Sequence, residues 1–388
     1  MPDIPVSNCC GCTACYNACP KSAIKMVPDE EGFAYPVVDK ELCIECGLCE
    51  RVCPVHAYPK LSESFVDCVI AQSESEEVLA QSTSGGFIDA LCKYILDERG
   101  GYAVGVVYDE SFMPVHVVAD SYEKAKEFRN SKYAQSDLGD SFKTIRELLS
   151  KGDQVMFVGT PCQVGGLKAF LRRDYDNLIT VDLVCRSIPS PKLWRKYLDW
   201  QESKHRSKIK SVSCRKKTYG YHSGALEIEF ENGKRYAGSN RVDYYMKSFH
   251  KDICSRRSCY QCDFKTKHRC SDFTVFDSWR PHLVTSPPVV DNDKGYSNVV
   301  VHTEKGSQVL RSLTGVKLYQ SDADKLFSVM GNMVEASIKP KAARETFYSD
   351  VEKDGFYRAA KKYSKVTLVD IAKEKAKPIR YFFKKNKS

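Results

Sequence analysis

The chain lacks the sequence features of exported and membrane-spanning proteins. Its start, MPDIPVSNCC, has no basic segment followed by an apolar run, and its 388 residues contain no stretch of 18 apolar residues. We therefore expect a protein that is neither exported nor inserted into a membrane, and that works in the cytoplasm.

The signatures of several common cofactor sites are missing as well. There is no G-x-G-x-x-G after a strand, no G-x4-G-K-[ST] and no H-E-x-x-H. These absences argue against an ordinary Rossmann-type NAD site and against a nucleotide triphosphatase. The eight histidines are scattered along the chain, so they mark no general acid or base, and the catalytic residues stay unassigned.

The excess of positive over negative charge is confined to one end of the chain. The formal net charge is +9, and residues 358–388 alone hold eleven Lys or Arg against two acidic residues. The rest is formally neutral, so we expect no nucleic-acid partner. With Ile379, Tyr381, Phe382 and Phe383 beside the charges, this tail is a candidate for peripheral contact with an anionic membrane or a partner. A solvated helix with a frayed end is the interpretation we favour.

Cysteine is abundant, with 18 residues, and two runs near the N-terminus fit the pattern C-x2-C-x2-C-x3-C-P. Three cysteines on a tight loop hold three corners of a [4Fe–4S] cluster, and the fourth ligand comes from the other run. This pattern predicts two clusters in a ferredoxin-type domain. One would be held by Cys9, Cys12, Cys15 and Cys53, and the other by Cys43, Cys46, Cys49 and Cys19.

The alternatives for these runs are structural zinc or a disulfide framework. Zinc sites usually combine two separated pairs of ligands, whereas each run here ends in C-x3-C-P. Clusters need reduced thiolates, so we expect a reducing and oxygen-poor, anaerobic setting. Cys10 lies outside the pattern and is interpreted as a spectator.

Beyond Pro54 the pattern changes to alternating strands and helices, which predicts an α+β or α/β fold. Strands are expected at 66–72, 103–108, 115–119, 154–159 and 179–185, the segments 297–303 and 315–321 complete the domain, and Asn232-Gly233 predicts a hairpin. We divide the chain into a dicluster ferredoxin-type domain (1–60), the N-terminal and C-terminal parts of one mixed α/β flavin-binding domain (61–175 and 176–345), and a basic helix or tail (346–388).

Four further cysteines are candidates for a third cluster. Cys162 and Cys185 follow expected strands, and we place Cys259 and Cys262 at a strand end too. Cys254 and Cys270 flank the last pair and could substitute for it. The alternative is that Cys162 and Cys185 are small buried residues while Cys259 and Cys262 bind zinc.

A chain of clusters moves single electrons, and a flavin commonly converts them into a hydride. Two segments could hold a flavin: SGGF, which opens an expected helix, and NSKYAQS, which offers Lys132. Each segment alone could equally be an ordinary loop or helix cap.

The order of these segments resembles the beta subunits of coenzyme F420-reducing hydrogenases and F420-dependent dehydrogenases, in the bacterial stand-alone form with a fused ferredoxin domain. The resemblance rests on the doubled cysteine run, STSGGF, NSKYAQS, FVGTPCQVGGLKAFL, DLVC with IPSPKLW, and RRSCYQCDFKTKHRCSDFTVFDSW. It implies an iron–sulfur flavoprotein with FAD and an additional cluster. Archaeal members move hydride to or from F420, a plant relative reduces a chlorophyll derivative, and bacterial members resemble proteins of polysaccharide synthesis.

The resemblance also implies site residues. Cys162, Cys185, Cys259 and Cys262 match the cysteines of the additional cluster. The residues matching the flavin segments are Ser84, Gly85, Gly86, Lys132, Tyr133, Gln135 and Ser136, with Arg215 and Lys217 as a basic pair near a phosphate. The chain departs from the family pattern at Arg186 and Arg280, which favour an anionic substrate and put F420 itself in doubt.

The sequence therefore predicts an oxidoreductase that takes electrons from reduced ferredoxin or a similar donor. They would pass through [4Fe–4S] clusters to FAD and on as hydride to F420 or another small-molecule acceptor, such as a polysaccharide precursor. The alternative is a non-catalytic electron-transfer subunit that serves a separate enzyme.

Overall fold

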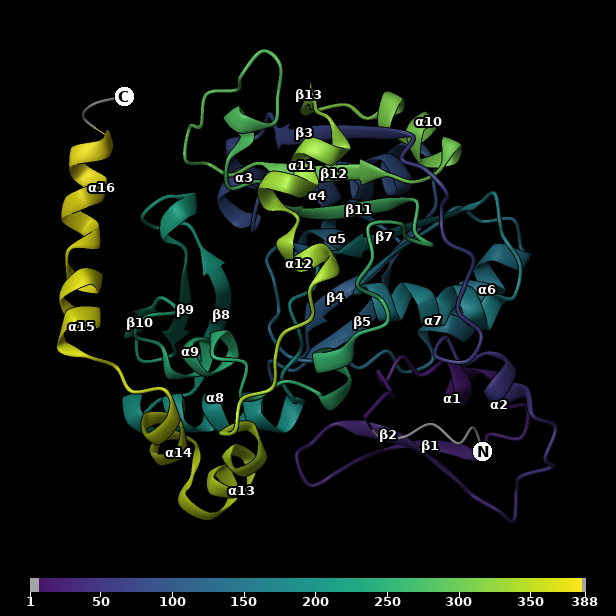
Figure 1. Ribbon diagram of the computed structural model, residues 1–388, viewed down its shortest axis with the longest axis horizontal. Helices are drawn as coiled ribbons and strands as arrows, with labels where there is room; N and C mark the ends of the chain where they lie inside the picture. The colour runs from purple at the N-terminus through teal and green to yellow at the C-terminus, as the bar shows by residue number, and fades with distance from the viewer. Residues whose placement is uncertain (1–6, 386–388) are drawn as a thin grey trace.

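The computed structural model describes residues 7–385 and has three parts (Figure 1). The N-terminal segment lies along one side of the molecule, beneath a large mixed sheet. A smaller sheet with its own helices lies beside the large sheet, and the C-terminal helices stand at the far side from the N-terminus.

The N-terminal segment consists of a hairpin and two short helices. Strands β1 (Ile24–Pro28) and β2 (Ala34–Val38) pair antiparallel. Each helix, α1 (Ala14–Ala18) and α2 (Leu48–Arg51), lies within one of the two cysteine runs. The runs therefore frame the hairpin, and α1 and α2 pack against each other.

The large sheet has eight strands in the order β13-β3-β12-β11-β7-β6-β4-β5. Its bounds are β3 (Asp67–Ser73), β4 (Tyr102–Tyr108), β5 (Pro114–Ala119), β6 (Val155–Gly159), β7 (Leu178–Leu183), β11 (Phe273–Asp277), β12 (Ser297–Val301) and β13 (Val316–Gln320). The central strands β4, β6, β7 and β11 are parallel and the outer pairs are antiparallel. Both expected parts of the flavin domain, 61–175 and 176–345, contribute strands to this one sheet.

Helices cover both faces of the large sheet. They are α3 (Glu76–Gln81), α4 (Phe87–Lys93), the π-helix η1 (Tyr94–Glu98), α5 (Tyr122–Ala125), η2 (Lys126–Phe128), α6 (Ser141–Ser150), α7 (Pro161–Leu171) and α10 (Glu304–Ser312). Strand β6 shows how the two cores form, since its alternate side chains point to opposite faces. Met156 packs with α4 and α10, whereas Phe157 packs with α6 and α7.

The core under α6 and α7 also contains residues of the N-terminal segment. Cys12, Ala14 and Val52 are buried there together with Leu167 of α7. The ferredoxin-type segment is therefore built into the main body, and it shares a hydrophobic core with the helix that follows β6.

The smaller sheet pairs β10 (Arg235–Gly238), β9 (Ala225–Phe230) and β8 (Ile209–Lys216). It packs with α8 (Pro191–His205) and α9 (Tyr244–His250) in a core rich in aromatic side chains, which also takes in α13 (Arg344–Asp354) and α14 (Phe356–Tyr363). Two short helices, η3 (Tyr221–Ser223) and η4 (Arg257–Gln261), lie in the same part of the chain. Three others, η5 (Pro281–Leu283), α11 (Ala323–Met330) and α12 (Asn332–Glu335), adjoin a core with β3 and β12 of the large sheet.

The basic tail forms two helices, α15 (Leu368–Lys375) and α16 (Lys377–Lys385). Asp370 pairs with Lys247, and Glu374 accepts hydrogen bonds from Ser239, so α15 is held against the body. Leu368 and Phe382 are largely exposed, and the Phe383 side chain lies outside the described part. Within residues 7–385, none of the helices combines the length and apolar character that a bilayer span requires.

The expected strands and the Asn232-Gly233 hairpin are all present. Strands β1, β2, β8 and β11 are additions that the sequence patterns do not predict. The helix expected from Phe87 changes to π-helical geometry at Tyr94, a local change that hydrophobic periodicity does not reveal.

Candidate metal centres and adjoining site

The first group of cysteines combines residues of both runs. Burial raises the pKa of Cys15 to about 12, and the nearby thiols of Cys9 and Cys53 add to the rise. Burial also raises the pKa of Cys53, which has Cys9 as a charged neighbour. Cys53 of the second run thus lies with the first run, in the crossed arrangement that a two-cluster ferredoxin uses.

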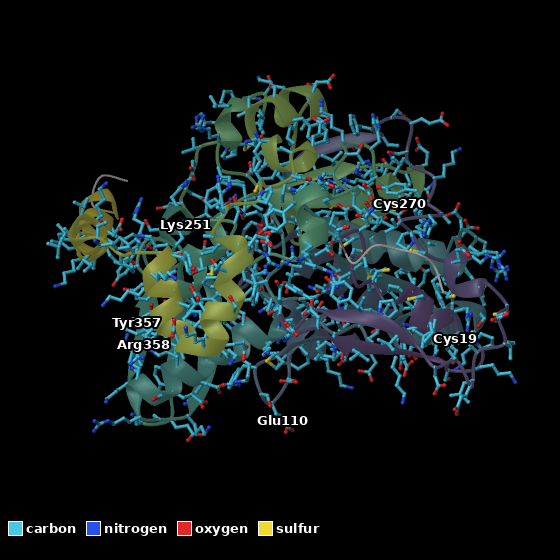
Figure 2. All side chains as sticks on the ribbon, turned by 60° about the horizontal axis from the view of Figure 1, so that its bottom comes forward. Cys19, Glu110, Lys251, Cys270, Tyr357 and Arg358 are labelled. Carbon is cyan, nitrogen blue, oxygen red and sulfur yellow. The ribbon has the colours of Figure 1, made fainter. Side chains whose placement is uncertain are left out.

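The second group lies nearer the surface. Cys46 is exposed, and burial raises the pKa of Cys49, which has Cys46 as a neighbour. Cys19 accepts a hydrogen bond from the Ala23 amide at 3.3 Å. Figure 2 shows Cys19 at the edge of the molecule, on the side opposite Tyr357 and Arg358.

Four cysteines from three separate segments form the third group. Cys162 lies in the first turn of α7, Cys185 follows β7, and Cys259 and Cys262 lie in and just after η4. The expectation that the last pair follows a strand is wrong, because a 3-10 turn carries it.

The four thiols of this group are electrostatic neighbours. Burial raises the pKa of Cys185 to about 12, with Cys162 and Cys262 adding to the rise. It also raises the pKa of Cys259, whose charged neighbours are Cys185, Cys262 and Cys162. Crowded buried thiols resist ionisation unless a cation joins them, so this donor set fits a group that binds thiolates.

The spacing of the thiols bears on the kind of group. Within residues 7–385, no three His, Cys, Asp or Glu side chains are placed to hold one metal ion together. In a [4Fe–4S] cluster each of the four thiolates binds a different iron, so the ligands stand further apart than around a single ion. Four neighbouring thiols supply the number of ligands that such a cluster takes.

The two flanking cysteines have other surroundings. Burial raises the pKa of Cys254, whose charged neighbours are Arg344 and Asp252. Burial raises the pKa of Cys270 to about 12, with Asp182 as the next cause. Neither has a thiol of the third group among these neighbours.

The sequence predicts a spectator role for Cys10, yet its thiol lies within hydrogen-bonding reach of both Cys12 and Cys162. That contact with Cys10 is the main reason why the pKa of Cys162 is raised. Cys10 therefore stands between the first group and the third. Sequence spacing alone gives no sign of this contact.

The residues predicted to lie near a flavin fall into two sets. In the first set, the Lys217 amine donates to the carbonyls of Leu79 (2.9 Å), Ser84 (2.7 Å) and Lys294 (2.6 Å). Burial lowers the pKa of Lys217 to about 8. A buried amine with a lowered pKa gains from an anion beside it.

Arg215 extends this set across the same region. Its guanidinium donates to the Tyr133 hydroxyl at 3.2 Å, lies 3.4 Å from a carboxylate oxygen of Asp277, and stands over the Trp279 ring at 5.2 Å. Trp279 in turn stacks on Tyr221 with ring centroids 4.5 Å apart, and 37% of Trp279 is exposed. Two cations and an accessible aromatic face therefore meet here.

The glycines of SGGF do not form an open cradle. The Gly85 amide donates to the Ser297 hydroxyl at 2.9 Å, and a Cβ on Gly85 would lie 2.2 Å from the Ala71 carbonyl oxygen. Gly86 adopts φ 78° and precedes the seven-residue helix α4. The Gly85 amide is thus already used inside the protein.

The second set lies in residues 132–136, and two of its members contact residues beside the cysteine groups. Gln135 donates to the Cys10 carbonyl at 3.2 Å, and Ser136 accepts from Gln163, the residue after Cys162, at 3.0 Å. Lys132 donates to the carbonyls of Glu127 and Arg129, and burial lowers its pKa to about 8.

The arginines expected to favour an anionic substrate differ in their surroundings. Arg186 is engaged by Asp252, with contacts of 2.7, 2.9 and 3.0 Å. Arg280 is exposed. Arg186 is therefore neutralised within the protein.

Two pockets adjoin these groups. One of about 330 Å³ lies beside the Lys217 region, between η3 and the C-terminal helices, and its lining includes Tyr219, His222, Asp293, Lys373 and Lys377. The other, of about 310 Å³, lies where the N-terminal segment meets the end of α7. It is lined by Ala18, Leu48, Val52, Arg146, Phe170, Leu171, Arg172 and Arg173.

Comparison with known proteins supplies two family matches. Residues 152–323 match the family described as the C terminus of the coenzyme F420 hydrogenase/dehydrogenase beta subunit. Residues 8–57 match a 4Fe-4S dicluster domain.

Similar proteins include a coenzyme F420-dependent sulfite reductase of Methanocaldococcus jannaschii, 26% identical over 311 residues. That match covers 78% of this chain but 45% of the relative, so the chain spans about half of that protein. A subunit of the F(420)H(2) dehydrogenase from Methanosarcina mazei is 23% identical over 359 residues, covering 86% of this chain and 90% of that relative. Among solved structures, a chain of the F420-reducing [NiFe] hydrogenase complex from Methanosarcina barkeri is 19% identical, with a TM-score of 0.45 over 77% of this chain and 91% of that chain.

Proposed function

Since the chain belongs to the coenzyme F420 hydrogenase/dehydrogenase beta subunit family, we propose that it is an iron–sulfur flavoprotein that delivers hydride to F420 or to another small-molecule acceptor. The dicluster domain and the relatives establish the coarser statement, an iron–sulfur oxidoreductase related to F420-dependent enzymes. FAD, the hydride step and the acceptor belong to the proposal.

One short segment carries the proposal, because residues 130–136 contact proposed flavin residues and also reach Cys10 and the turn of Cys162. Ser131 bonds to Thr83 beside SGGF at 2.9 Å, and Tyr133 accepts from Arg215. Further along the same segment, Gln135 reaches Cys10 and Ser136 reaches the turn of Cys162. The proposed flavin residues and two cysteine groups thus adjoin a single loop.

The residues that would hold the clusters are the three cysteine groups described above. Clusters in these groups would supply stepwise one-electron transfer between the surface and the interior. Cys46 leaves the second group accessible, whereas the buried thiols of Cys12 and Cys53 place the first group inside. The arrangement runs from an exposed group to a buried one.

The residues that would hold FAD are Arg215, Lys217, Tyr133 and Trp279. A flavin accepts single electrons and gives a hydride, so it would link the clusters to a two-electron acceptor. The basic pair suits a pyrophosphate, and the Trp279 ring offers a face for a flat ring system. The same region adjoins the pocket of about 330 Å³, which is a candidate space for the acceptor.

The electron donor we propose is a small acidic protein of the ferredoxin type. Arg146, Arg172 and Arg173 are exposed at the pocket of about 310 Å³, and none of them forms an ion pair within residues 7–385. Ala18 and Leu48 of the same pocket adjoin Cys19 and Cys49 in the chain. A positive surface beside the accessible cluster group favours encounter with a negatively charged donor.

A second candidate function is supported by the hydrogen bonds around SGGF. The Gly85 amide is used by Ser297, and the Lys217 amine already donates to three carbonyls. If these contacts persist, the chain binds no flavin and transfers electrons on behalf of a separate enzyme.

Flavin content separates the two functions. After anaerobic purification and incubation with FAD, we expect about one FAD per chain, and we expect Arg215→Met with Lys217→Met to remove it. Arg186→Met is the matched control, because this arginine is engaged by Asp252. A reconstituted protein with its clusters and without FAD would support the second function. Screening the reduced protein against F420, nicotinamides and nucleotide sugars would then identify the acceptor.

A further inference from the structure

Arg256 is fully buried and has no acidic partner. Its relative exposure is 0%, and within residues 7–385 its guanidinium forms no ion pair with Asp or Glu. Burying an unpaired charge is costly, so proteins rarely do so without a counter-charge. Arg344, the other fully buried arginine of this region, follows the usual rule and pairs with Glu31.

The donors of Arg256 are directed at the first cysteine run. Its Nε donates to the Cys9 carbonyl at 2.7 Å, and one terminal nitrogen donates to Gln135 at 3.0 Å. The other terminal nitrogen donates to the Ala34 carbonyl at 3.0 Å and lies 3.7 Å from the Cys9 sulfur. The flat face stands over the Tyr35 ring at 4.1 Å. The positive charge is thus fixed in place beside a ligand thiol.

The chain around Cys9 is shaped to admit this guanidinium. Gly11 has φ +71°, and a Cβ atom there would lie 2.9 Å from a terminal nitrogen of Arg256. Glycine is therefore required at this position both by its backbone conformation and by the close approach of Arg256.

Arg256 also connects the first cysteine group to the third. Its carbonyl accepts from the Cys259 amide at 3.0 Å, so the backbone that carries the arginine also positions a ligand of the third group. Arg256 is in addition a charged neighbour of Cys162. Arg256 therefore contacts both the first and the third cysteine group.

We infer that Arg256 is the buried counter-charge of the first cluster and raises the reduction potential of this cluster relative to the second. Four thiolates bring four negative charges to the site, and one-electron reduction adds another. A fixed cation at Cys9 stabilises the reduced, more negative state more than the oxidised state, and its hydrogen bond to sulfur acts in the same direction. The inference rests on the proposed clusters, and it assigns electron flow from the exposed second cluster to the buried first one.

A purely structural role would use the same hydrogen bonds. Arg256 could act as a clamp that joins the carbonyls of Cys9 and Ala34 without affecting the cluster. The electrostatic role and the structural role can be separated by a lysine substitution. Lysine keeps the positive charge but lacks the planar guanidinium that binds several acceptors at once.

The experiment is a redox titration, followed by electron paramagnetic resonance, of the full chain carrying Arg256→Met or Arg256→Lys. We expect Arg256→Met to lower the first cluster's potential by at least about 59 mV, a tenfold change in the one-electron equilibrium. Arg256→Lys should keep most of the wild-type value, and the second cluster serves as the internal reference. The matched control is Glu31→Gln with Arg344→Met, which removes one negative and one positive charge together and should leave both potentials unchanged.

Potentials that do not move in Arg256→Met, or that fall equally in Arg256→Lys, would overturn the inference. If Arg256→Met assembles no first cluster, the contact is tested instead in wild-type protein labelled with 15N-arginine. A 15N hyperfine coupling on the reduced first cluster supports the contact, and its absence refutes it. Failure of the proposed function is distinguishable, because wild-type protein would then carry its clusters without FAD, and both cluster potentials could still be measured.

Discussion

The sulfur of Cys12 lies against Gly166 of α7, so closely that a Cβ atom on the glycine would stand 2.8 Å from it. The same helix carries Cys162 in its first turn. A single helix therefore sets the position of the first cysteine group relative to the third. Hydrophobic packing of Leu167 with Ala14 and Val52 holds the two parts together.

Gly166→Ala should displace Cys12, because carbon and sulfur cannot approach so closely. We expect the variant to lose the first cluster, about four irons per chain, while far-UV circular dichroism stays unchanged. The gain in helix propensity, about 1 kcal/mol, favours the helix rather than the cluster. Gly165→Ala is the matched control, since its Cβ would meet the Phe264 ring at 2.7 Å and not Cys12. Equal iron in Gly166→Ala and wild type would contradict the prediction.

The ligand set of the third group can be tested against its neighbours in sequence. Cys259→Ala with Cys262→Ala should remove about four irons from the reconstituted protein, because both thiols face Cys185 and Cys162. Cys254→Ala should remove none, since its thiol lies among Arg344 and Asp252. Iron and sulfide analysis of the purified variants checks this. If Cys254→Ala lost iron and the double variant of Cys259 and Cys262 did not, Cys254 would be a ligand and our assignment would be wrong.

Whether the sequence predicts a metal ligand depends on how far apart in the chain the contacting residues are. The two N-terminal runs predict their ligands because the spacing is local and each thiol is a few residues from the next. The sequence leaves six candidate cysteines for the third group, since spacing does not tell whether Cys254 or Cys259 faces Cys185. The neighbours of each thiol in the fold distinguish them.

The roles of Cys10 and Arg256 lie beyond sequence reasoning for the same reason. Arg256 meets Cys9 across 247 positions in the chain, and no local pattern marks that contact. Of the predicted flavin residues, Tyr133 and Arg215 do meet, whereas Gln135 and Ser136 turn towards the cysteine groups. Residues of one sequence motif therefore lie at different places in the fold.

The arginine-lined pocket predicts a salt-dependent reaction with an acidic donor. Arg172→Glu with Arg173→Glu should slow reduction of the clusters by an acidic ferredoxin by roughly tenfold at low ionic strength, and wild-type rates should fall as salt is added. Stopped-flow bleaching of the visible absorption measures both. The control is Arg358→Glu with Lys361→Glu, an equal change of charge on α14, where Figure 2 places Arg358 on the side opposite Cys19. Equal slowing in both variants would indicate a general charge effect and no docking surface.

His116 should make the fold sensitive to acid. Burial lowers the pKa of its imidazole to about 4, whereas in the unfolded chain it titrates near its ordinary value. Between these values the unfolded state binds the extra proton, so the free energy of unfolding falls as pH drops from about 6.5 to 4. His116→Phe keeps the stacking on Phe157 and removes this proton.

The expected result is that His116→Phe is stabilised relative to wild type by roughly 1 kcal/mol more at pH 5.5 than at pH 7.5, about one pKa unit of the window. Thermal unfolding of both proteins at the two pH values measures the difference, and effects shared by the two proteins cancel. A difference that is independent of pH would show that His116 does not titrate in this range.

Iron and acid-labile sulfide per chain, measured after anaerobic reconstitution, test the central claim most directly. Three cysteine groups that each hold a [4Fe–4S] cluster predict about twelve irons and twelve sulfides, with broad visible absorption. About eight of each would limit the protein to the two N-terminal groups. A colourless protein with neither iron nor sulfide would contradict the account.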